Sequence, residues 1–99
     1  MTELNFNTLG WGDEEVLQLA VVLPLCAKLT KLTLEVNEIN DAGATAIAGV
    51  LPVMAVLTTL YLNENAIGEK GAEALAGALR VNAVLTGGKQ CKVFGVRGV

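Results

Sequence analysis

The stretch from Leu62 to Glu73, LNENAIGEKGAE, has the composition of a cation-binding loop. It places asparagines and glutamates around a central glycine, and oxygen-rich loops of this kind bind calcium. The EF-hand calcium motif, however, needs an oxygen ligand at loop position 5 and an acidic residue at position 12. Counted from Asn63, these positions hold Ile67 and Ala74. Two ligand positions therefore fail, and we expect the loop to be structural, with no metal and no cofactor.

Few side chains in this chain could carry out catalysis. The 99 residues include no histidine and no serine, which excludes Ser-His-Asp and Cys-His arrangements. Cys26 and Cys91 are too far apart for a CxxC motif. We expect Cys26 to pack in an apolar segment and Cys91 to lie exposed in an irregular tail. No nucleophile is paired with a base, so the sequence predicts a protein that is not an enzyme.

Composition and charge exclude several kinds of partner. Hydrophobic residues make up 53% of the chain and aromatic residues 4%, which predicts one domain with an aliphatic core. No apolar run is long enough to span a membrane, and the first residues lack the pattern of a signal peptide. All ten acidic residues lie within residues 1–86, and an acidic body repels nucleic acid. We therefore expect a cytoplasmic protein that binds neither nucleic acid nor membranes.

A repeat of 28 residues organises the chain. The segment LTKLTLEVNEINDAGATAIAGVLPVMAV, from Leu29, aligns without gaps with LTTLYLNENAIGEKGAEALAGALRVNAV, from Leu57. A more divergent copy precedes them, and a degraded copy follows, whose FGVRGV matches IGEKGA only if one residue is deleted. The prediction is a single domain, 1–99, with repeats at about 1–28, 29–56 and 57–84 and a degenerate partial repeat at 85–99.

Each unit combines two periodicities. Residues 31–35 alternate polar and apolar side chains, which is typical of a half-buried strand. The second half of the same unit places Ala44, Ile47, Ala48 and Leu51 on one face of a helix. One strand and one helix cannot bury both of their faces alone. Stacked in register, such units form a parallel sheet on one side and a layer of helices on the other.

The turn between strand and helix keeps the same asparagine in two units. Asn37 and Asn65 are expected to satisfy the backbone of this turn, because an amide side chain both donates and accepts. Asp13 and Asp41 fall at predicted helix starts, where a negative charge complements the helix dipole. The asparagine and the acids therefore have structural roles that require no ligand.

The repeated pattern LxxLxLxxNxIxxxG resembles the ribonuclease-inhibitor type of leucine-rich repeat, as in the repeat regions of NOD-like receptors. The resemblance covers residues 1–86 and implies an α/β fold: a leucine-rich repeat solenoid with a curved parallel β-sheet on the concave side and α-helices on the convex side. Most members use their repeats to bind another protein. The resemblance therefore implies a non-enzymatic protein–protein interaction module that binds a partner on its concave face. The alternatives are a regulator similar to the Ran GTPase activator, or a truncated repeat piece with no independent function.

The alternation within the strands predicts which side chains form the binding face. The leucines point toward the helices, so their neighbours point outward, and two glutamates in the following turns extend this surface along one rim. Tyrosine is a common anchor of protein interfaces, and one tyrosine lies in this set. The predicted protein-binding residues are Lys31, Thr33, Glu35, Thr59, Tyr61, Asn63, Glu38 and Glu64.

The two ends of the array lack the polar caps that repeat proteins usually carry. The first predicted strand begins near Met1, and residues 85–99 hold no complete unit. This pattern predicts a fragment of a longer array, or ends that stack on another protein or self-associate with a second copy.

Overall fold

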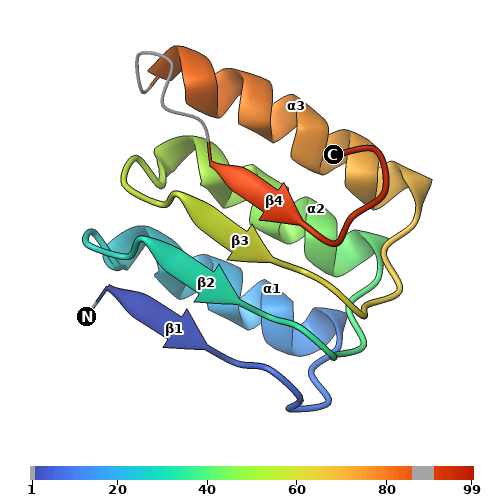
Figure 1. The fold of residues 1–99 in the computed structure, drawn as a ribbon. Helices are drawn as coiled ribbons and strands as arrows, with labels where there is room; N and C mark the ends of the chain where they lie inside the picture. The colour runs from blue at the N-terminus through green and yellow to red at the C-terminus, as the bar shows by residue number, and fades with distance from the viewer. Residues whose placement is uncertain (1, 86–90) are drawn as a thin grey trace.

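The computed structural model describes residues 2–85 and 91–99. Strands and helices alternate along this chain, and the strands form one parallel sheet in the order β1-β2-β3-β4. All the helices cover the same face of that sheet (Figure 1), which confirms the predicted α/β repeat architecture. The strands are β1 (Glu3–Asn5), β2 (Lys31–Thr33), β3 (Thr59–Tyr61) and β4 (Lys92–Phe94), and the helices are α1 (Asp13–Val22), α2 (Asp41–Val50) and α3 (Glu69–Leu85).

The register of the sheet follows the repeat for three strands and then changes. Lys31 lies opposite Thr59, 28 positions further on, whereas Leu60 lies opposite Val93, 33 positions further on. Phe94 consequently pairs with Tyr61 and does not take the place of Ile67. The predicted alignment of FGVRGV with IGEKGA is therefore wrong. Part of the predicted partial repeat, residues 86–90, lies outside the described residues.

Helix α3 is longer than its neighbours because it lacks a proline. The first two helices end in short 3-10 turns that contain Pro24 and Pro52, and proline cannot continue an α-helix. The third unit has Arg80 at that position, and α3 continues to Leu85. Its extension carries Asn82, a buried amide that donates to the Leu51 carbonyl (3.0 Å) and accepts from the Cys91 N–H (3.3 Å). Asn82 thus attaches the start of β4 to the helical layer.

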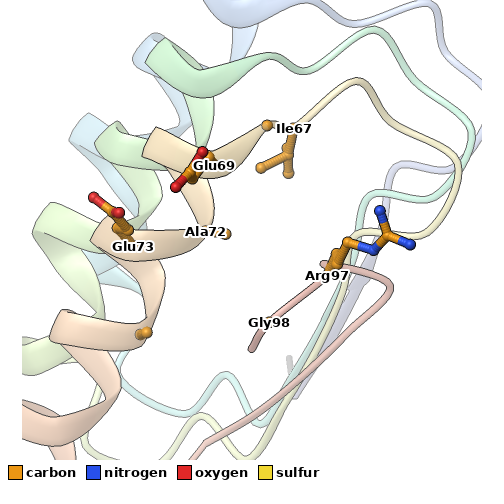
Figure 2. Close-up of a pocket in the computed structure, with 8 residues that line it drawn as sticks. Ile67, Glu69, Ala72, Glu73, Arg97 and Gly98 are labelled. Atoms are coloured by element: carbon orange, nitrogen blue, oxygen red, sulfur yellow. The ribbon is translucent and has the colours of Figure 1, made fainter.

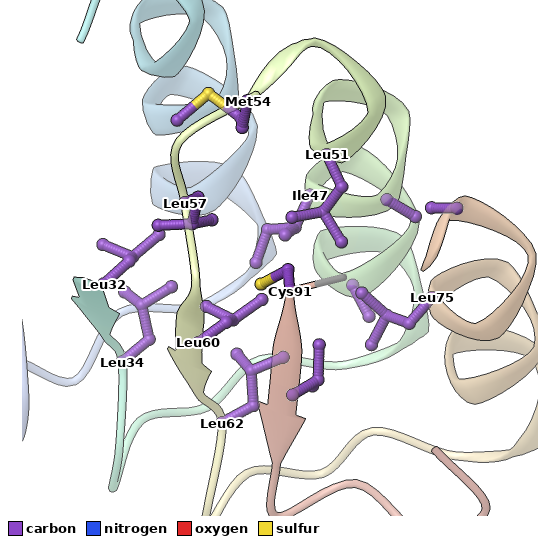
Figure 3. Close-up of a cluster of buried hydrophobic side chains, with 14 of the residues drawn as sticks. Leu32, Leu34, Ile47, Leu51, Met54, Leu57, Leu60, Leu62, Leu75 and Cys91 are labelled. Carbon is purple, nitrogen blue, oxygen red and sulfur yellow. The ribbon is translucent and has the colours of Figure 1, made fainter. Parts of the chain in front are cut away.

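A continuous aliphatic core fills the space between the sheet and the helices (Figure 3). Leu32 and Leu60 point into it from adjacent strands, and Ile47 and Leu75 meet them from the helices. Cys91 also lies in this core and is only 2% exposed. The expectation of an exposed tail cysteine is therefore wrong, because the residues that follow Cys91 form a strand of the sheet.

Candidate functional site

The repeated asparagine ties each turn to the unit before it. Asn37 accepts hydrogen bonds from the N–H groups of Leu9 and Trp11, both at 3.0 Å. Its amide nitrogen donates to the carbonyls of Phe6 (2.9 Å) and Leu34 (3.1 Å). Asn37 therefore joins two successive turns as well as holding its own.

Asn65 repeats this arrangement in the loop whose composition suggested a cation site. Its Oδ1 accepts from the Ile39 N–H at 3.0 Å, and its Nδ2 donates to the carbonyls of Leu34 (2.8 Å) and Leu62 (3.1 Å). The amide group is thus engaged with backbone on both sides, as the sequence predicted for the turn. Within residues 2–85 and 91–99, no group of three or more acidic or cysteine side chains is placed to hold a metal ion.

A left-handed backbone recurs in every turn. Thr8, Val36 and Glu64 have φ values of 59°, 56° and 59° and are spaced 28 residues apart. Such values are uncommon outside glycine and are strained for a β-branched residue such as valine. None of the three residue types signals this conformation, so the sequence did not predict it. The repeated turn requires this backbone angle whichever residue occupies the position.

The aspartates at the helix starts act on the next helix rather than on their own. Asp13 Oδ1 accepts from the N–H groups of Asn40 (2.8 Å) and Gly43 (2.9 Å) at the start of α2. Asp41 Oδ1 does the same for Gly68 (2.7 Å) and Gly71 (3.1 Å) at the start of α3. Each aspartate therefore caps the helix of the following unit, a function that the dipole argument had not identified.

The face of the sheet away from the helices, here called the open face, holds the predicted strand residues. Lys31 and Thr59 occupy one row across β2 and β3 and are partly exposed, and Thr33 and Tyr61 occupy the next row. Thr33 is only 6% exposed, so it offers little surface to a partner. Its hydroxyl oxygen is buried and has no hydrogen-bond partner among the described residues.

The remaining predicted residues follow the strands. Glu35 and Asn63 are half-buried, whereas Glu38 and Glu64 are exposed in the turns. The Glu35 backbone is fixed because its N–H donates to Asn7 Oδ1 at 2.7 Å. The Asn63 Oδ1 atom is buried without a partner in the described part of the chain. These residues follow the strands and form one rim of the open face.

Two aromatic rings lie next to each other on the open face, one on β3 and one on β4 at the edge of the described sheet. Tyr61 stacks on Phe94, with ring centroids 4.9 Å apart and an interplanar angle of 18°. The Lys31 ammonium nitrogen lies 5.5 Å from the centroid of the Tyr61 ring, within the range of a cation–π contact. Phe94 is 40% exposed. The pair therefore presents apolar ring surface to solvent, with a lysine over its tyrosine.

Sequence reasoning missed Phe94 and Lys92, which complete the two rows of the open face. Lys92 lies opposite Thr59, and Phe94 lies opposite Tyr61. Both were overlooked because the repeat spacing changes before β4. The alternation Lys92-Val93-Phe94, which matches Thr59-Leu60-Tyr61, was the available signal.

The two thiols are expected to react very differently. Burial raises the pKa of the Cys91 thiol to about 11, because the core disfavours the thiolate. Cys26 is only partly buried. At pH 8 iodoacetamide should label Cys26 in the folded protein and leave Cys91 unlabelled, since the thiolate is the nucleophile. Peptide mass spectrometry before and after denaturation measures this. Equal labelling of both cysteines in the folded protein would contradict the buried position of Cys91.

The geometry defines an α/β repeat protein whose units stack through shared turns and caps. A family model described as Leucine Rich repeat matches residues 25–48 and again residues 53–76, two adjacent units of this fold. The chain therefore carries leucine-rich repeats. No curated protein matches it.

Across the part of the chain described by the structure, none of the helices combines the length and hydropathy required to cross a bilayer.

Proposed function

We propose that this protein is a non-enzymatic interaction module, in which the open face binds another protein. Leucine-rich repeats are generally protein-interaction modules, which supports the proposal at the level of the family. The observation that carries it is the stacked and partly exposed Tyr61–Phe94 pair. Exposed aromatic pairs of this kind fit a role as interface anchors, because interface energy concentrates in a few large side chains.

The charges beside the aromatic pair indicate what the partner presents. Lys31 and Lys92 lie on either side of Thr59 in one row of the sheet. Strands are about 4.8 Å apart, so the two lysines are spaced by roughly twice that distance. A partner segment with an apolar side chain on the rings and a carboxylate near the lysines would complement this surface. Glu35, Glu38 and Glu64 lie on the rim. They would repel a partner segment bound in the reverse orientation, with its carboxylate at the rim and not near the lysines.

Replacing Tyr61 or Phe94 with alanine is expected to weaken partner binding by about thirtyfold, the equivalent of about 2 kcal/mol at an anchor position. The measurement is quantitative affinity capture from native extract, followed by titration of the captured protein. Val84→Ala is the matched control, because Val84 is exposed on α3 in the helical layer.

A partner that is retained equally by Tyr61→Ala, Phe94→Ala and Val84→Ala would place the interface elsewhere. Circular dichroism of each variant shows whether the fold persists, so that a loss of binding is assigned to the surface. For the alternative of a GTPase regulator, an arginine that reaches a partner's nucleotide would be needed, and Arg80 lies on α3 in the helical layer, away from the open face.

A further inference from the structure

Two pockets on the surface differ in how they relate to the stacking of the units. The larger has a volume of about 620 Å³ and lies between α3 and the segment of Arg97 and Gly98 (Figure 2). A further unit of the array would stack on this side of α3, so the exposure of the larger pocket depends on the length of the array. The smaller pocket lies between the first two units, and units added at either end would leave it uncovered.

The smaller pocket belongs to the edge where helices lead into strands, which runs along one side of the molecule (Figure 1). Its volume of about 200 Å³ is below the roughly 300–1,000 Å³ of most small-molecule sites, so it has room for one apolar side chain. The lining is uncharged and comes from the turns after α1 and α2. It consists of Pro24, Cys26, Ala27, Leu29, Val53, Met54, Ala55 and Val56.

Exposed apolar side chains lie beside this pocket. Leu25 is 82% exposed, the largest fraction for any large apolar side chain among the described residues. It stands between Pro24 and Cys26, which both line the pocket, so it lies next to the opening. Val53 holds the same position 28 residues later and is 64% exposed. Contiguous apolar surface of this kind marks interaction sites on soluble proteins. This surface, Leu25 with the smaller pocket, is here called the apolar edge.

The apolar edge carries almost no charge. Lys28 is the only charged residue in segments 22–30 and 50–58. Most acidic residues lie at the opposite edge, where strands lead into helices, as Glu38, Asp41, Glu64 and Glu69 do. Two copies that meet through their apolar edges would therefore keep their acidic edges apart. One lysine provides little attraction to an anionic bilayer, so the charge pattern does not favour a lipid surface.

We propose that a second copy of this chain docks on the apolar edge, with Leu25 of each copy in the smaller pocket of the other. A two-fold interface uses the same patch on both copies, so a projecting group must lie beside a recess on one surface. Leu25 and the pocket next to it meet this requirement. The lack of charge also fits, because the buried core of a protein interface is depleted in charged residues. The contact is separate from the open face and does not depend on the function proposed for it.

Sedimentation velocity of the full chain from about 5 µM to 1 mM should show a reversible dimer, with a dissociation constant on the order of 100 µM, because the patch is small. Leu25→Glu should weaken the dimer at least tenfold, since it would bury a carboxylate in an apolar pocket. Ala55→Phe should weaken it to a similar degree by filling the pocket. Thr45→Glu adds the same charge on the exposed side of α2 and should leave the dimer unchanged.

Disulfide trapping tests the contact directly. Leu25→Cys, oxidised with diamide at high protein concentration, should give a covalent dimer that joins position 25 of one copy to Cys26 of the other. The two thiols can bond only if they approach closely, and Cys26 lines the pocket that position 25 enters. Val21→Cys is the matched control, because Val21 is exposed on α1 and does not line the pocket. Peptide mass spectrometry identifies the linked positions.

Three results would overturn the proposal, with circular dichroism showing that each variant is folded. The first is a chain that stays monomeric up to about 1 mM. The second is a dimer that Ala76→Glu abolishes and Leu25→Glu leaves intact, which would place the contact on the outer side of α3. The third is a monomer that floats with phosphatidylserine vesicles and loses this binding in Leu25→Glu, which would identify a lipid surface as the occupant.

Discussion

Replacing Asn37 with alanine is expected to lower the free energy of unfolding by about 3–5 kcal/mol, because several buried backbone groups lose their partner at once. The Leu9 and Trp11 N–H groups lose an acceptor, and the Phe6 and Leu34 carbonyls lose a donor. A domain of this size is stabilised by only about 5–15 kcal/mol in total, so the variant should be close to unfolding at physiological temperature.

Urea denaturation followed by circular dichroism measures this loss. Asn5→Ala is the matched control, because the Asn5 side chain is exposed and accepts only from the Asn7 N–H in the described structure. Its effect should stay within about 0.5 kcal/mol. Asn37→Asp should resemble the alanine variant, because a carboxylate keeps the acceptor but cannot donate to carbonyls. An Asn37→Ala variant as stable as Asn5→Ala would show that the shared turn contributes little to stability.

The repeat was predictable from sequence because the side chains that define it have the same surroundings in every unit. Leu32 and Leu60 recur at a fixed spacing, and both are fully buried. Asn37 and Asn65 recur in the same register, and hydrogen bonds to backbone explain that recurrence. Periodicity alone thus predicts the strand, the helix and the core, since each depends on contacts that repeat with the unit.

Features that join one unit to the next were not predictable in the same way. The aspartate caps link residues about 27–30 positions apart, such as Asp41 with Gly68 and Gly71. The dipole argument assigned each aspartate to the helix that it begins, because a negative charge at that position also stabilises the same helix. The paired recurrence of an acid and a glycine in successive units was the signal for the longer contact, and it becomes interpretable only when the units are stacked.

The open face shows the same division. Lys31, Thr59 and Tyr61 were located by alternation, which is a local property of a strand. Phe94 was missed because its strand is displaced by five residues relative to the repeat. The alternation of side chains within a strand does not show that the whole strand is displaced relative to the repeat. The most exposed ring of the candidate site therefore lay outside the pattern that predicted the rest.

The attachment of β4, and with it the aromatic pair, is expected to depend on Gly95. Its φ is +86°, and a Cβ at this position would lie 2.5 Å from both the backbone nitrogen and the Cα of Asn63. Backbone atoms cannot rotate away as a side chain can. Gly95→Ala should therefore lower the free energy of unfolding by about 3 kcal/mol, of which about 1 kcal/mol is the cost of the left-handed conformation for alanine.

Gly98→Ala separates these two contributions. Gly98 has the same φ of +86°, but nothing lies within 4 Å of an added Cβ, so only the conformational cost applies. In Gly95→Ala, hydrogen exchange should accelerate at the Leu62 amide, which donates to the Phe94 carbonyl at 2.9 Å, and Cys91 should become open to alkylation. Partner binding on the open face should fall as well, since Phe94 moves with β4. If the exchange rate of the Leu62 amide and the alkylation of Cys91 are the same in Gly95→Ala and Gly98→Ala, the close contact between Gly95 and Asn63 does not hold β4 in place.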